Sequence, residues 1–185
     1  MGEHFLSIMI FLPVIAGGAL LLFPFSRGFA RSLGFIASVI VALMGLKLFV
    51  QFSGSSGMYG FVEEAPLIES FGINHSLGVD GISLLIMVAA AALFPMVFLL
   101  FKEKAKGYYA NLLIVQGAMI GAVCAADMVL FYIFWEVMLL PIFFMIGLYG
   151  GPGRIPATIR ITIYTISGSL LMLASIMYLG VVHHA

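Results

Sequence analysis

One stretch of the sequence decides the fold: Asp127-Met128-Val129-Leu130-Phe131-Tyr132-Ile133-Phe134-Trp135-Glu136-Val137-Met138-Leu139-Leu140-Pro141. It belongs to an apolar segment long enough to cross a membrane, and it carries one carboxylate, Glu136, in its interior. A charged side chain near the centre of a bilayer costs from about 3 kcal/mol to more than about 10 kcal/mol. Such a residue normally faces protein or water and has a function, so Glu136 is the residue that needs an explanation.

The composition around this stretch is that of a membrane protein. Of the 185 residues, 63% are hydrophobic and only 9% are charged, whereas a soluble domain carries about 25% charged residues. The mean hydropathy is +1.21. The formal net charge is zero, and the chain has no basic tract and no zinc-ligand spacing, which argues against a nucleic-acid partner.

Six apolar segments are each long enough to cross the hydrocarbon core as a helix. The sequence therefore predicts an all-α integral membrane protein with a single membrane domain in the lipid bilayer. The expected helices cover about residues 5–25, 29–52, 80–101, 108–126, 128–149 and 159–182, and residues 53–79, rich in Gly, Ser, Pro and Asn, are expected to form a long external loop.

The positions of the basic residues predict an orientation. Seven of the eight Lys and Arg residues lie in or beside alternate connections between the predicted helices: Arg27, Arg31, Lys102, Lys104, Lys106, Arg154 and Arg160. Cytoplasmic loops carry an excess of Lys and Arg. We therefore expect the first, third and fifth connections in the cytoplasm and both termini on the periplasmic side.

Two interpretations of Glu136 follow from the residues alone. Desolvation raises the pKa of a carboxyl group and a nearby cation lowers it, so a cation that moves could make Glu136 take up and release a proton. Alternatively, Glu136 only forms a hydrogen bond with a neighbouring helix. Pro141 supports the first interpretation, because its ring clashes with the carbonyl of Val137 and frees that group for water.

Three other polar features have a structural and a functional interpretation each. Lys47 lies near the end of the second predicted helix, where its long side chain can reach the interface or act within the membrane. Asp80 can cap the third helix or take part in function. A stripe of hydroxyl groups on one face of the sixth helix can line a hydrated path or bridge helices; it consists of Thr158, Thr162, Thr165 and Ser169.

The remaining features predict packing. Gly117 and Gly121, beside Ala118 and Ala122, form a small face that a neighbouring backbone can approach. Cys124 is the only cysteine, so we expect it to pack as a small hydrophobic residue. His75 is expected to be solvated or to cap a turn. The chain has no nucleophile and base pair, no phosphate-binding loop and no ligands for a flavin, haem or iron–sulfur cluster.

The apolar stretch also resembles a known family. Residues 130–144, with Gly78-Val79-Asp80-Gly81-Ile82-Ser83 upstream and Ile163-Tyr164-Thr165 and Gly168-Ser169-Leu170 downstream, are similar to the antiporter-like subunits of respiratory complex I. Within that group the chain most resembles the M-type chain, also called chain 4. The resemblance implies the N-terminal six-helix portion of a proton-translocating membrane-arm subunit, with no redox or catalytic centre of its own, in a bacterial inner membrane.

The same resemblance implies roles for particular residues and partners. Glu136 matches the glutamate that the family requires for proton transfer, and Arg160 lies where the family commonly has a lysine. The lysine that partners the glutamate lies in a helix after the sixth, so we expect another segment to supply it. NADH, FMN, iron–sulfur clusters and quinone are expected in partner subunits. The alternatives are a subunit of a multi-subunit sodium/proton antiporter or membrane-bound hydrogenase, and a scaffold that transports nothing.

Overall fold

The computed structural model describes residues 4–52, 61–68, 73–101 and 105–184. It contains six helices, namely α1 (Phe5–Leu22), α2 (Arg27–Gln51), α3 (Gly81–Leu100), α4 (Lys106–Cys124), α5 (Met128–Tyr149) and α6 (Arg154–His184), and two strands, β1 (Phe61–Ile68) and β2 (Ile73–Val79). All six helices are long and apolar enough to cross a membrane. The chain is therefore a helical, multi-pass membrane protein, as the sequence predicts.

Some helix boundaries differ from those predicted. α1 ends at Leu22, because Pro24 cannot continue a helix. α2 begins at Arg27, where Ser26 caps it by accepting a hydrogen bond from the backbone N–H of Phe29. α6 begins at Arg154 rather than near residue 159. Pro156 fits in the first turn of this helix, because the N–H groups of the first turn have no acceptor within the helix and proline lacks only that group.

The expectation of a loop across residues 53–79 is wrong for its second part. β1 and β2 form an antiparallel pair in which Phe61 lies opposite Val79. The free edge of β2 is also occupied, since the backbone N–H of Ala126 donates to the carbonyl of Ser76 over 2.9 Å. Strand pairing satisfies backbone groups that an open loop would leave to water, and it joins the hairpin to the connection between α4 and α5.

Several predicted positions lie outside the described residues. These are residues 53–60 and 69–72 of the expected loop, and Lys102 and Lys104 of the third connection. The backbones of His75, His183 and His184 are described but their side chains are not.

Glycine contacts set the packing around α4, which lies beside both α1 and α5. A Cβ atom added to Gly117 would lie 2.5 Å from the carbonyl oxygen of Ile10, and one added to Gly17 would lie 2.7 Å from that of Ala110. A Cβ atom at Gly121 would lie 2.6 Å from the ring of Phe134. The predicted small face of α4 is confirmed, and it brings α4 close to two neighbours.

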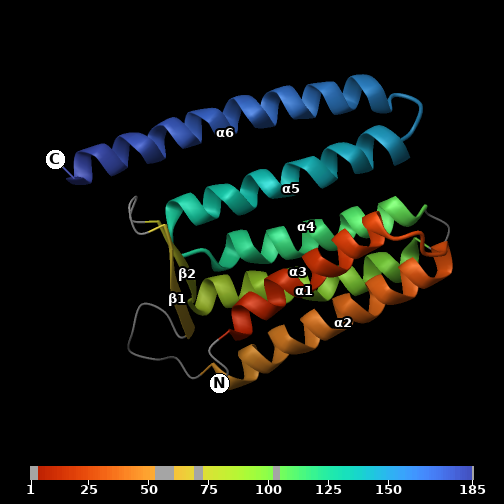
Figure 1. The fold of residues 1–185 in the computed structure, drawn as a ribbon, viewed down its shortest axis with the longest axis horizontal. Coiled ribbons are helices and arrows are strands. Elements are labelled where there is room, and N and C mark those ends of the chain that lie inside the picture. The colour runs from red at the N-terminus through yellow and green to blue at the C-terminus, as the bar shows by residue number, and fades with distance from the viewer. Residues whose placement is uncertain (1–3, 53–60, 69–72, 102–104, 185) are drawn as a thin grey trace.

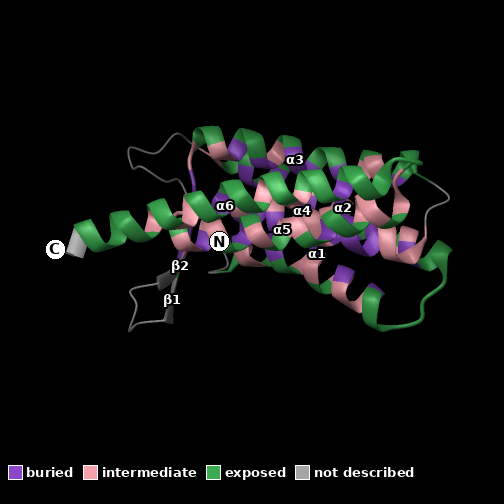
Figure 2. Ribbon diagram, turned by 90° about the horizontal axis from the view of Figure 1, so that it is seen from above, coloured by how far each residue is buried: buried purple, intermediate pink, exposed green. Residues whose placement is uncertain are grey.

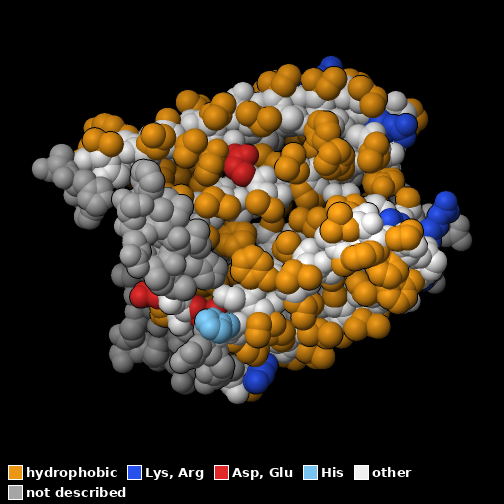
Figure 3. Space-filling view, viewed as in Figure 1, with side chains coloured by type: hydrophobic (Ala, Val, Ile, Leu, Met, Phe, Trp, Pro, Cys, Tyr) orange, Lys and Arg blue, Asp and Glu red, His pale blue; other side chains and the backbone are white. Residues whose placement is uncertain are grey.

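The outer helix of the bundle is α6, which packs against α5. Most of its surface is exposed in Figure 2, including large hydrophobic side chains such as Ile163 and Leu171. The C-terminal ends of α1, α3 and α5 and the N-terminal ends of α2, α4 and α6 lie together at one end of the bundle, opposite the strands (Figure 1). Figure 3 shows most of the Lys and Arg side chains gathered at that same end.

Candidate functional site

The central residue of the site is Glu136, on α5. Asp127 caps this helix by accepting hydrogen bonds from the backbone N–H groups of Val129 and Leu130, at 2.8 and 2.9 Å. At about 1.5 Å per residue, Glu136 then lies roughly 13 Å along the helix. Glu136 is the one acidic residue of α5 and α6, and Figure 3 shows that hydrophobic side chains dominate the surface over these two helices.

The Glu136 side chain is half-buried, and its Oε1 atom is buried without a hydrogen-bond partner in the described structure. An unsatisfied buried polar atom costs on the order of 1–3 kcal/mol. Native structures keep few of them, and each one calls for an explanation such as a water, an ion or a functional role. The geometry therefore gives Glu136 capacity to bind a further group.

A cavity of about 640 Å³ adjoins this carboxylate. Its lining comes from α5 and α6 and consists of Trp135, Glu136, Val137, Met138, Leu139, Leu140, Ile142, Phe143, Ile161, Thr162, Thr165 and Ile166. Glu136 is its one ionisable residue. The cavity is large enough for several water molecules, and its mainly apolar lining provides the low dielectric in which a charge interacts strongly with a partner.

The hydroxyl stripe of α6 lies on the side that faces α5. Thr158 and Ser169 are each only 4% exposed, and Thr162 and Thr165 line the cavity. The hydrogen bonds of the stripe stay within α6, since Thr165 Oγ1 donates to the carbonyl of Ile161 over 2.6 Å and Ser169 Oγ donates to that of Ile166 over 3.1 Å. The stripe therefore borders the cavity, and Thr158, Thr165 and Ser169 donate their hydroxyl protons to carbonyl groups of their own helix.

Tyr132 is a member of the site that the sequence analysis missed. It precedes Glu136 by four residues, which places both on one face of α5. Its hydroxyl group lies near the Glu136 carboxylate and the Ser169 hydroxyl group. The spacing of four residues was readable in the sequence, but the approach of Ser169 from α6 was not.

Pro141 is buried within α5, and the helix continues through it. Proline has no backbone N–H, so the carbonyl of Val137 loses its helical donor. Val137 lines the same cavity as Glu136. The structure thus places the loosened backbone next to the carboxylate.

The other candidate supporting residues lie elsewhere. Arg160 is exposed, and its position two residues from Thr158 and Thr162 places it about 200° around α6, on the side away from α5. Lys47 is exposed, and its Nζ lies 5.3 Å from the centre of the Phe5 ring, a cation–π contact. Neither residue lines the cavity beside Glu136.

Asp80 is a helix cap, which confirms its structural interpretation. Its carboxylate accepts a hydrogen bond from the backbone N–H of Ser83 over 2.6 Å, and its own backbone N–H donates to Ser83 Oγ over 2.8 Å. This is the reciprocal pattern of a capping box. The bonds from the backbone and then the side chain of Ser83 lower the pKa of Asp80 below its ordinary value.

Glu63 has a structural role that the sequence did not indicate. It lies on β1, is only 9% exposed, and accepts hydrogen bonds at the start of α1 from the backbone N–H groups of Leu6 and Ser7 and from Ser7 Oγ, at 2.5, 3.0 and 2.8 Å. The first N–H groups of a helix have no partner within it. Glu63 therefore supplies acceptors that join the hairpin to α1.

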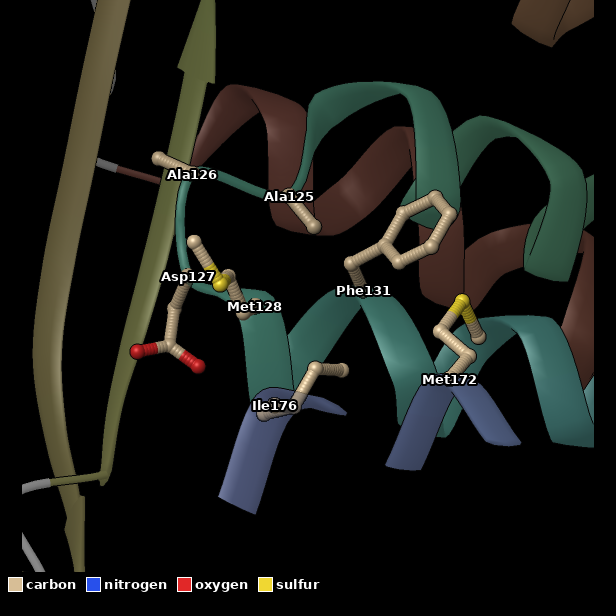
Figure 4. Close-up of a pocket in the computed structure, with 7 residues that line it drawn as sticks. All are labelled: Ala125, Ala126, Asp127, Met128, Phe131, Met172 and Ile176. Atoms are coloured by element: carbon tan, nitrogen blue, oxygen red, sulfur yellow. The ribbon is translucent and has the colours of Figure 1, made fainter. Parts of the chain in front are cut away.

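Cys124 is buried, and its Sγ lies 3.5 Å from Sδ of Met87, so it packs as predicted. A second cavity, of about 320 Å³, lies between the α4–α5 connection, the start of α5 and α6. It is lined by Ala125, Ala126, Asp127, Met128, Phe131, Met172 and Ile176. Figure 4 shows the Asp127 carboxylate pointing away from Phe131 and Met172. Among the described residues, no group of three His, Cys, Asp or Glu side chains could hold a metal ion.

The fold and the site define a class of protein: a bundle of membrane helices with one carboxylate facing a cavity between two of them. Comparison with known proteins defines this class more closely. Residues 125–183 match the family described as NADH:quinone oxidoreductase/Mrp antiporter, transmembrane. This match includes the α4–α5 connection, all of α5 and nearly all of α6.

The similarity to curated proteins extends over nearly the whole chain. The chain is 34% identical to F(420)H(2) dehydrogenase subunit M of Methanosarcina mazei, over 92% of this chain and 35% of the relative. It is 37% identical to NADH-ubiquinone oxidoreductase chain 4 of Arabidopsis thaliana, over 95% of this chain and 38% of the relative. It is 34% identical to NADH-quinone oxidoreductase subunit M of Rhodobacter capsulatus, over 94% and 35%. The chain thus spans about a third of the length of these relatives.

Solved structures give the same result. A chain of respiratory complex I from Thermus thermophilus matches with a TM-score of 0.81 and 31% identity, over 91% of this chain and 34% of that one. The Mrp complex from Dietzia sp. DQ12-45-1b matches with a TM-score of 0.74 and 20% identity, over 91% of this chain and 18% of that one, which shows a shared fold. Residues 125–183 thus match a family of membrane subunits, and over nearly its whole length the chain is similar to about a third of the subunit M relatives.

Proposed function

We propose that this chain forms part of an M-type proton-translocating subunit in the membrane arm of an NADH-quinone oxidoreductase. In this role it moves protons while electron transfer takes place in other subunits. The observation that carries the proposal is Glu136, whose buried Oε1 has no hydrogen-bond partner and whose side chain lines a cavity between α5 and α6.

The chemistry of the cavity supports proton exchange at Glu136. An ionised carboxylate in a low dielectric is unfavourable unless a cation or water compensates it. The cavity has room for water, and the carbonyl of Val137, freed by Pro141, adds a polar group beside it. Glu136 would take up a proton when no cation is near and release it when a cation approaches.

The cation that would approach Glu136 must come from outside the residues that line the cavity. No Lys or Arg lines the cavity within the part of the chain that the structure describes, and Arg160 lies on the opposite side of α6. We therefore propose that a lysine from another segment or polypeptide approaches Glu136 through this side of α5 and α6. This makes other membrane-arm subunits the main partners of the chain.

We also propose a bacterial inner-membrane location with the first, third and fifth connections in the cytoplasm. The clustering of basic residues at that end of the bundle supports this orientation, since cytoplasmic loops carry the positive excess. NADH, FMN, iron–sulfur clusters and quinone would be bound by partner subunits. A reporter at the C-terminus should be active only on the periplasmic side; activity in the cytoplasm would contradict the orientation.

The decisive experiment is Glu136→Gln in the assembled complex, with proton pumping measured in membrane vesicles during quinone reduction. The substitution keeps the shape of the side chain and removes the titratable group, so pumping should be lost while the complex still assembles. Glu64→Gln is the matched control, because Glu64 is an exposed residue of β1, and pumping should be unchanged. Normal pumping by the Glu136 variant would reject the proposal.

The two alternatives give different results in the same assay. A subunit of a sodium/proton antiporter or of a membrane-bound hydrogenase would not copurify with an arm that oxidises NADH and reduces quinone. A scaffold would lose assembly rather than pumping when Glu136 is replaced. The scaffold alternative does not explain why an unpartnered carboxylate oxygen lies beside a cavity within a membrane helix.

A further inference from the structure

Two cavities follow one another along the contact between α5 and α6. The cavity beside Glu136, of about 640 Å³, takes its lining from the middle of α5 and the first half of α6. The second cavity, of about 320 Å³, is lined by the α4–α5 connection, the start of α5 and the second half of α6. It therefore lies nearer the end of the bundle that carries the strands, the strand end (Figure 1). A path from the strand end to Glu136 along these two helices passes through both cavities.

A pair of aromatic rings on α5 borders both cavities. Phe131 lines the second cavity, and Trp135 lines the cavity beside Glu136. The two residues are four positions apart, which places them on one face of the helix, and their ring centres are 5.9 Å apart. Figure 4 shows the Phe131 ring and Met172 on the side of the second cavity away from Asp127. The ring pair thus lies where one cavity ends and the other begins.

The division between the cavities is also short on α6. Ile166 lines the cavity beside Glu136, and Met172 lines the second cavity. Their separation along the helix is about 9 Å. Ser169 lies midway between them and is only 4% exposed. Its hydroxyl group donates to the carbonyl of Ile166, which leaves two lone pairs that can accept hydrogen bonds from water.

Both cavities have room for several water molecules. The hydroxyl groups of Thr162 and Thr165 and the carbonyl of Val137 are polar groups in the lining residues beside Glu136. Between the cavities the rings of Phe131 and Trp135 present mainly apolar surface. In membrane proteins a hydrophobic constriction gates by losing its water, and a ring pair of this kind has the character of such a constriction.

We propose that the two cavities form one water-access route to Glu136, which enters from the strand end of the bundle and is closed by the Phe131–Trp135 ring pair. The route admits water, and through water the proton. Rotation of one ring about its side-chain bonds joins the two cavities. The inference deepens the proposed function, because the use of the route in transport rests on proton exchange at Glu136. The hydration of the route does not depend on transport.

Cysteine labelling of the assembled complex in sealed membrane vesicles tests the route. The reagent is a positively charged methanethiosulfonate that does not cross the membrane. It reacts with the thiolate, so a thiol that faces lipid stays unlabelled. Met172→Cys reports on the second cavity and should react when the reagent is added at the strand end. Thr165→Cys reports on the cavity beside Glu136 and should not react from that end while both rings are present.

Phe131→Ala removes one ring of the pair. Thr165→Cys should then react from the strand end, whereas the rate at Met172→Cys should change little. Phe131→Leu should give a smaller increase, and it keeps the test available if the alanine variant does not assemble. Ile163→Cys is the matched control on the same helix, because Ile163 is 58% exposed and lines neither cavity. It should stay unlabelled with and without the Phe131 ring.

The outcomes separate this inference from the proposed function. The route would be overturned if Met172→Cys stayed unlabelled from the strand end, or if Thr165→Cys stayed unlabelled in both Phe131 variants. Equal rates at Met172→Cys and Thr165→Cys with the rings intact would overturn the barrier, and labelling of Ile163→Cys would show that the whole helix is open to water. Normal pumping by Glu136→Gln would reject the proposed function instead. Labelling needs no transport, so either idea can fail while the other is supported.

Discussion

Gly117 of α4 lies directly against the backbone of Ile10 in α1, so closely that a Cβ atom would come within 2.5 Å of the Ile10 carbonyl oxygen. Helices in membranes associate through small residues that let backbones approach. The obstacle here is backbone, which cannot rotate away as the end of a flexible side chain can. The crossing of α1 and α4 therefore depends on this glycine.

Gly117→Leu should weaken the crossing of α1 and α4. Overpacking a close contact costs typically about 1–3 kcal/mol, so the temperature of unfolding in detergent should fall. The matched control is Gly18→Leu in α1, because a Cβ atom at Gly18 meets nothing within 4 Å. Equal loss of stability in both variants would show that the contact is unimportant.

Glu63→Ala should detach the hairpin from the start of α1. It removes the acceptor for two backbone N–H groups and one hydroxyl group, and leaving a buried donor unsatisfied costs about 1–3 kcal/mol. Hydrogen exchange at Leu6 and Ser7 should accelerate. Glu64→Ala, on the same strand but exposed, should leave that exchange as it is.

Ser38 and Gln116 form a polar pair inside the bundle that a double-mutant cycle can measure. Ser38 Oγ donates to Gln116 Oε1 over 2.8 Å, and Gln116 Nε2 has no partner in the described structure. Ser38→Ala should lower the free energy of unfolding by about 1–3 kcal/mol, because the buried amide loses its remaining bond. Adding Gln116→Leu should recover part of this loss, and a purely additive result would contradict the pairing.

Acid should weaken the start of α3 through Asp80. Hydrogen bonds from Ser83 lower the pKa of Asp80 in the folded protein below its ordinary value of 3.8. A group with a lowered pKa stabilises the fold fully above that ordinary value and loses this contribution as the pH falls through the lowered pKa. The free energy of unfolding should therefore fall as the pH is lowered from about 5 to about 2, the range in which carboxyl groups titrate.

Asp80→Asn is the control for this pH dependence, because it keeps a capping side chain without a titratable group. The loss of stability in acid that is due to Asp80 should be absent from this variant. Ser83→Ala should reduce it, since the serine hydroxyl group contributes to the lowered pKa. An unchanged acid profile in Asp80→Asn would show that other groups cause the loss.

The number and place of the membrane helices were predictable from the sequence, because the length of an apolar segment is a local property and each helix satisfies its own backbone. Glu136 and the spacing between Tyr132 and Glu136 were readable for the same reason. Arg160 could also have been placed away from the hydroxyl stripe by helical periodicity alone. These features depend only on neighbours along the chain.

Tertiary structure alone decided the features that join distant segments. The hairpin was hidden because strand pairing depends on a partner and on Ala126, which lies far along the chain. Glu63 belongs to a segment that the sequence predicts as an external loop, and only the fold places it beside the start of α1. The cavity at Glu136 likewise exists because α6 lies against α5 with its hydroxyl stripe inward. Local hydrophobicity fixed which segments cross the membrane, whereas packing between them determined which polar groups meet.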